Sequence, residues 1–132
     1  MKVLALDYGA ARTGVAVSDA TGTLARPLGV VERATTNRGL TRIAEMVEAE
    51  AVECVVVGMP FRLTGERGMQ ALETEGFLTR LREVLSVPVD VFDERFTTAL
   101  AQQSPGRQAP EDARAAAHLL TSYLTWITAG RT

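Results

Sequence analysis

The start of the chain has the short apolar spacing that is typical of β-strands. Residues 3–6, 13–18 and about 24–31 are three short, largely apolar stretches, and Val15 and Val17 alternate with smaller residues in the second. Gly9 and Gly14 flank the connection between the first two stretches, which predicts a hairpin. Pro27 lies within the third stretch and indicates an edge strand or a bulge. We therefore expect the fold to begin with a three-stranded meander.

From residue 37 the apolar spacing becomes helical, and Asn37 is a candidate cap. The residues of this apolar stripe are Leu40, Ile43, Ala44, Val47 and Ala51. The β-branched run at residues 52–57 predicts a strand that is buried on both faces. A loop is expected over residues 61–68, followed by a helix with a weaker stripe that starts at Leu72.

The last third of the chain predicts one more strand and two more helices. The strand covers residues 89–92, and Thr97 or Thr98 can cap a short helix that ends near Gln103. Pro110 suits the first position of a final helix that runs to about Ala129. This order predicts a single mixed α/β domain over residues 1–132, in which a three-strand meander is joined by two parallel strands reached through helical crossovers.

Composition restricts the location more than the function. The apolar runs are far shorter than the roughly 20 residues of a membrane span, and the start of the chain lacks the apolar core of a secretory signal. Cys54 is the single cysteine and lies in the buried valine run, so no intrachain disulfide is expected. These features predict a cytoplasmic protein. The net charge of −2 provides no global basic field that would attract nucleic acid.

Acidic residues follow the strands at the edge where open α/β sheets have their sites. Asp7 ends the first strand, Asp93 and Glu94 end the last, and Asp112 opens the final helix. Strand alternation sends Asp93 and Glu94 to opposite faces, so at most one of them should point into a site. Asp112 lies on the packing face of its helix. The other residues of that face are Ala116, Leu119 and Tyr123.

Three carboxylates that converge at one edge repel one another unless a proton or a cation lies between them. Oxygen ligands suit Mg²⁺ or Mn²⁺, and two such ions are a standard means of cutting a phosphodiester. Each acid taken alone is better explained as a helix-dipole partner or a turn residue, and only the convergence of three gives the site interpretation equal weight. The glycine-rich turn after Asp7 offers another interpretation, because actin-like and sugar kinases bind nucleotide phosphates with such a turn. Those proteins use two lobes, and this chain has room for one.

Five motifs together resemble the YqgF family, also called RuvX, whose members are bacterial proteins with a ribonuclease H-like fold. The motifs are Leu6-Asp7-Tyr8-Gly9 with Arg12, Gly14-Val15-Ala16-Val17-Ser18-Asp19, Val56-Val57-Gly58-Met59-Pro60, Asp93-Glu94-Arg95-Phe96-Thr97-Thr98, and Asp112 with Ala115-Ala116. The resemblance extends from Val3 to about Trp126.

The resemblance implies a metal-dependent nuclease that processes the 5′ end of pre-16S rRNA or acts as a Holliday junction resolvase. It also implies that Asp7, Glu94 and Asp112 are the catalytic and metal-binding carboxylates, and so favours Glu94 over Asp93. A homodimer is expected from the family alone. The rival interpretation is a catalytically silent protein that binds nucleic acid or a ribosome precursor.

Four arginines are candidates for binding substrate phosphates, with ordinary surface solvation as the alternative. They are Arg12, Arg62, Arg67 and Arg95. The family's basic segment before the helix aspartate is short here, and Arg107 is the single basic residue between Ala99 and Glu111. This departure leaves the choice between structured RNA and four-way junction DNA open.

Overall fold

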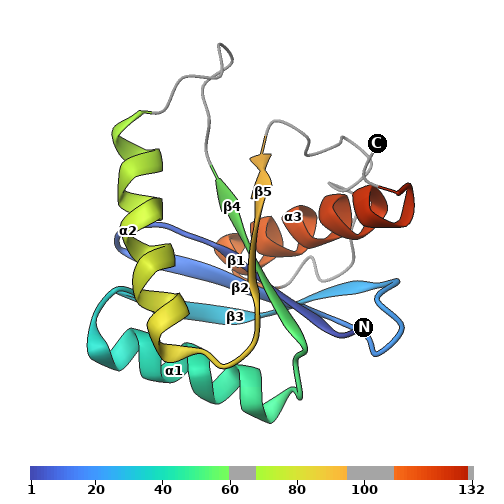
Figure 1. Cartoon of the computed structure of the whole chain (residues 1–132), viewed down its shortest axis with the longest axis horizontal. Coiled ribbons are helices and arrows are strands. Elements are labelled where there is room, and N and C mark those ends of the chain that lie inside the picture. Colours follow the sequence, from blue (N-terminus) through green and yellow to red (C-terminus); the bar gives the residue numbers. More distant parts are fainter. Residues whose placement is uncertain (60–67, 95–108, 131–132) are drawn as a thin grey trace.

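The computed structural model describes residues 1–59, 68–94 and 109–130, which form a five-stranded sheet with helices on both faces (Figure 1). The strands are β1 (Val3–Asp7), β2 (Arg12–Ser18), β3 (Ala25–Glu32), β4 (Cys54–Met59) and β5 (Val89–Asp93). The helices are α1 (Asn37–Ala49), α2 (Met69–Val84) and α3 (Glu111–Thr128). The predicted short helix near Gln103 and most of the predicted loop at 61–68 lie outside the described residues.

The sheet has the strand order β3-β2-β1-β4-β5. β1 and β2 are antiparallel, as are β2 and β3, whereas β4 pairs parallel to β1 and β5 pairs parallel to β4. The prediction of a meander followed by two parallel strands is therefore confirmed. β3 lies at the edge, and its register shifts because Val15 pairs with Gly29 and Ala16 with Pro27, which leaves Leu28 as an extra residue. Pro27 thus marks both an edge strand and a bulge.

Alternation along the strands divides the core into two layers. Leu4 and Leu6 of β1 pack with α1 and α2 on one face, while Val3 and Ala5 pack with α3 on the other (Figure 1). β4 is buried along its whole length, as its β-branched run predicts. Asp7 continues the sequence of alternate positions that face α3.

Two local predictions about the helices are wrong. Thr36, not Asn37, caps α1, because the Thr36 hydroxyl accepts a hydrogen bond from the backbone N–H of Gly39 at 3.1 Å. The side chain of Leu72 is 56% exposed, because the buried face of α2 is centred elsewhere. The buried residues of α2 are Ala71, Thr74, Phe77, Leu78 and Leu81. Within the described part of the chain, no helix has the length and apolar character needed to cross a membrane.

The first turn of α3 lies directly on β2 because Gly14 has no side chain. A Cβ atom at Gly14 would come within 1.8 Å of the backbone oxygen of Asp112. Ala16 continues the same face of β2, and α3 meets it with small residues. Those residues include Ala116 and Ala117. Small side chains on both surfaces thus fix the position of Asp112 relative to the sheet.

We predict that Gly14→Ala lowers the free energy of unfolding by about 1–3 kcal/mol, because the added methyl group collides with backbone rather than with a flexible side chain. Gly76→Ala in α2 is the matched control. Its Cβ would meet no atom within 4 Å, so the better helix former should stabilise the protein by up to about 1 kcal/mol. Urea denaturation of both variants measures the difference, and equal effects would refute the close approach of α3 to β2.

Candidate active site

Three acidic side chains from distant parts of the sequence lie at the carboxyl end of β1, β4 and β5. Asp7 is the last residue of β1, Glu94 directly follows β5, and Asp112 is the second residue of α3. Gly58 of β4 has its missing side chain on the α3 face, where a Cβ would lie 2.7 Å from Glu94 Oε1 and 3.1 Å from a methyl carbon of Leu119. Glu94 therefore lies over Gly58 on the same face of the sheet as α3.

Asp7 and Glu94 contact each other through a shared hydrogen bond. Burial is the main cause that raises the pKa of Glu94 to about 7, and the hydrogen bond to Asp7 and the charges of Asp7 and Asp93 raise it further. Burial also raises the pKa of Asp7, and the charge of Asp112 adds to this, while the hydrogen bond from Glu94 acts in the opposite direction. The pair thus retains a proton near neutral pH, with protonated Glu94 as the donor to Asp7.

Asp112 has a different partner. Its Oδ2 atom lies 3.1 Å from the Nε atom of Arg12, and the carboxylate is about one-third exposed. The β1–β2 hairpin brings Arg12 to this position, because Asp7 pairs with Gly14 and Arg12 lies two residues before Gly14, on the same face of β2. The sequence predicted a phosphate contact for Arg12, and the structure shows an ion pair with a candidate metal ligand.

The acids suit a divalent cation without forming a complete ligand set. Within residues 1–59, 68–94 and 109–130, no three His, Cys, Asp or Glu side chains lie close enough together to hold a metal ion. Even so, two partly buried carboxylates that share a proton, with a third near enough to raise a pKa, have the character of a site for a hard cation. Such a cation would replace the shared proton and satisfy the oxygen atoms.

The remaining candidate residues fall into three groups. Asp93 continues the register positions of Val89 and Val91, which pack on the α1–α2 face, whereas Glu94 lies beyond the end of β5. The polar residues His118 and Ser122 of α3 are half-buried and buried, because the packed face of α3 is wider than the predicted stripe. Arg62, Arg67 and Arg95 lie outside the described residues.

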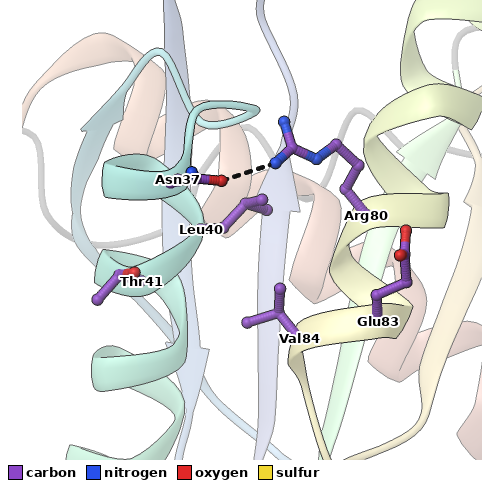
Figure 2. A pocket seen from close by; sticks show the side chains of 6 residues that line it. All are labelled: Asn37, Leu40, Thr41, Arg80, Glu83 and Val84. Carbon is purple, nitrogen blue, oxygen red and sulfur yellow. Dashed lines mark hydrogen bonds between the residues drawn. The ribbon is translucent and has the colours of Figure 1, made fainter.

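A separate pocket of about 220 Å³ lies between α1 and α2, against the opposite face of the sheet (Figure 2). Arg80 donates a hydrogen bond at 2.9 Å to Asn37 Oδ1 and another to the backbone oxygen of Thr35. This arginine is thus engaged in holding the start of α1. The pocket contains none of the candidate acids.

The chain matches the family model described as "RuvX: Holliday junction resolvase" over residues 1–126. It belongs to the RuvX family.

Relatives of similar length support this assignment. A protein of Desulforudis audaxviator is 40% identical over 139 residues, covering 99% of each chain. One of Chloroflexus aurantiacus is 39% identical over 130 residues, covering 92% of this chain and 85% of its own. Both carry the name "Putative pre-16S rRNA nuclease".

Solved structures show the same fold at low sequence identity. RuvC of T. thermophilus in complex with a Holliday junction substrate has a TM-score of 0.71 at 18% identity and covers 98% of this chain and 96% of its own. Fowlpox virus resolvase with Holliday junction DNA has a TM-score of 0.53 at 12% identity. The RuvX chain therefore has the ribonuclease H-like architecture of the resolvases, as expected.

Sequence reasoning missed the two glycines that shape this RuvX site. Gly14 was interpreted only as the flank of a turn, and Gly58 only as the end of a strand. Both lie inside strands, where glycine weakens the strand unless another group must come close. That position within a strand was the available signal.

We predict that the stability of the metal-free protein falls as the pH rises from about 4.5 towards 7. The folded state holds a proton on Glu94 up to about pH 7, whereas the unfolded chain releases it near pH 4.5, so folding is favoured at the acidic end of this window. Allowing for solvent screening at this partly exposed group, the difference in Tm should be about 3–4 °C. Thermal denaturation of wild type and Glu94→Gln in chelator measures it. A slope of the same size in both proteins would contradict the assignment.

Proposed function

We propose that this RuvX protein is a nuclease that hydrolyses phosphodiester bonds in nucleic acid with the help of Mg²⁺ or Mn²⁺. The observation that carries the proposal is the pair of Asp7 and Glu94, two partly buried carboxyl groups joined by a hydrogen bond beside Asp112 at the carboxyl edge of the sheet. Membership of a resolvase family and relatives named for rRNA cleavage support the same class of reaction.

Asp7, Glu94 and Asp112 are the residues that would hold the cation. Asp7 interacts with both of the others, through a hydrogen bond with Glu94 and through the charge of Asp112, so it would be the central residue of the set that holds the ions in a two-metal-ion mechanism. A divalent cation bound here supplies activation of the attacking water and stabilisation of charge on the leaving oxygen. The chain itself contributes partial burial, which strengthens electrostatic interactions at the site.

The substrate class follows from the relatives. We propose either pre-16S rRNA, at its 5′ end as the family resemblance implies, or a four-way DNA junction; relatives are named for pre-16S rRNA and structural neighbours for Holliday junctions. With a net charge of −2, attraction of phosphates must come from local arginines. We assign that role to Arg12, Arg62, Arg67 and Arg95.

Junction cleavage would further require a homodimer that presents two sites. We place the activity in the cytoplasm.

The turn after Asp7 is closed on itself. Thr13 Oγ1 lies 3.4 Å from both the backbone nitrogen and the backbone oxygen of Gly9, and a Cβ at Gly9 would come within 2.4 Å of the backbone oxygen of Arg12. The N–H of Gly9 thus already has a partner, which leaves it less available to a nucleotide phosphate.

We expect Asp7→Asn to reduce cleavage at least about 100-fold on whichever substrate wild type cuts, because the variant loses the central carboxylate. The assay uses the pre-16S RNA and a four-way DNA junction, each in Mg²⁺ and in Mn²⁺. Glu111→Gln is the matched control, since Glu111 is exposed and adjacent to Asp112.

The same variant should be at least as stable as wild type in chelator at pH 8, because it removes a buried charge that repels its neighbours. Lost cleavage with retained stability would thus identify a chemical defect rather than misfolding. Equal inactivity of wild type and Asp7→Asn on both substrates would instead favour a binding protein without catalytic activity.

A further inference from the structure

The ion pair between Arg12 and Asp112 determines the state of the site before a cation binds. Arg12 Nε lies 3.1 Å from Asp112 Oδ2, and the arginine side chain is 64% exposed. Asp112 is also close enough to Asp7 for its charge to raise the pKa of that group. The Asp112 carboxylate therefore acts on two neighbours, the Arg12 guanidinium at the rim and the Asp7 carboxylate inside the site.

The ion pair and a metal site compete for the same oxygen atoms. In the described part of the chain, the three acids do not come together as a ligand set, and the carboxylate engaged elsewhere is Asp112. The backbone of Asp112 lies directly against β2 at Gly14. A change of partner by Asp112 therefore requires reorientation of its side chain rather than movement of its backbone.

We propose that Arg12 is a positioning residue that holds the Asp112 carboxylate apart from the Asp7–Glu94 pair in the metal-free protein and releases it when a divalent cation enters. The inference rests on the proposed function, because it assumes that the acids bind a cation.

Replacement of the Arg12–Asp112 ion pair by a bound metal ion is favourable for both Asp112 and Arg12. Exposed ion pairs contribute little to stability, so a cation can replace this one at small cost. Without Arg12, the Asp112 carboxylate would have lost its 3.1 Å counter-charge and would repel the neighbouring acids more strongly. Once released, the Arg12 guanidinium lies exposed at the rim, where its planar fork matches the geometry of a substrate phosphate. Arg12 thus neutralises an acid in the resting state and becomes available to the substrate in the loaded state.

The test measures the affinity for Mn²⁺ alone, without nucleic acid, by isothermal titration calorimetry. The proteins are wild type, Arg12→Gln, Asp112→Asn and the double variant. Arg12→Gln should bind Mn²⁺ about two- to fivefold more tightly than wild type, because the Arg12 guanidinium no longer competes with Mn²⁺ for the Asp112 carboxylate. The gain should disappear in the Asp112→Asn background, where there is no carboxylate left to release.

Arg33→Gln is the control for a general effect of charge. The backbone N–H of Arg33 donates to the oxygen of Ala11 at 3.0 Å, so Arg33 lies next to the start of β2, and it forms no ion pair with any described residue. An equal gain in Arg33→Gln, or a gain from Arg12→Gln that persists without Asp112, would overturn the proposal. So would an unchanged or weaker affinity in Arg12→Gln.

The outcomes separate this proposal from the proposed function. If wild type binds Mn²⁺ and loses it in Asp7→Asn while Arg12→Gln has no effect, the metal site stands and the role of Arg12 is refuted. If wild type binds no Mn²⁺, both are refuted. Thermal denaturation of each variant in chelator establishes that the compared proteins are folded.

Discussion

The repulsion between carboxylates held together out of bulk water is the constraint on which this site depends. Asp7 and Glu94 are partly buried and in contact, so they cannot both be ionised at low cost, and the pKa of each is raised. A surface protein region would avoid such an arrangement by turning one side chain outward. Here β1, β4 and β5 end at one edge and α3 covers the same face, so the acids stay together. The repulsion between the carboxylates is reduced by a proton in the resting protein and, in our proposal, by a divalent cation in the active one.

Small residues make this arrangement possible. Gly14 lets the backbone at Asp112 contact the sheet, and Gly58 leaves the space that the Glu94 side chain occupies. On the same interface, Phe92 and Tyr123 pack edge to face and Trp126 lies against both rings. Phe92 pairs with Gly58 in the sheet, so this aromatic cluster adjoins the position of Glu94.

Two different groups compensate the negative charge of the resting site. A shared proton reduces the charge of the inner pair, and the exposed Arg12 compensates the outer acid. Compensation by the shared proton depends on pH, whereas compensation by Arg12 does not, because the guanidinium keeps its charge throughout the neutral range. A cation that replaces both would therefore leave a guanidinium at the rim, beside the position where a phosphate must lie. Metal binding and substrate binding are linked in this scheme through one side chain.

The sequence by itself determined the order of strands and helices and limited the candidate acids to a few positions. The hairpin glycines, the bulge at Pro27 and the buried run of β4 could be predicted because each depends on residues that are close together in the sequence. Asp7, Asp93, Glu94 and Asp112 were candidates because each adjoins the end of a strand or the start of a helix, and the family resemblance then favoured Glu94 over Asp93. The sequence could not show that Arg12 pairs with Asp112, one hundred residues away, or that Gly14 and Gly58 open space for neighbours that are distant along the chain. Those contacts exist only after α3 packs on the sheet, because tertiary packing alone decides which side chains of separate elements share a face.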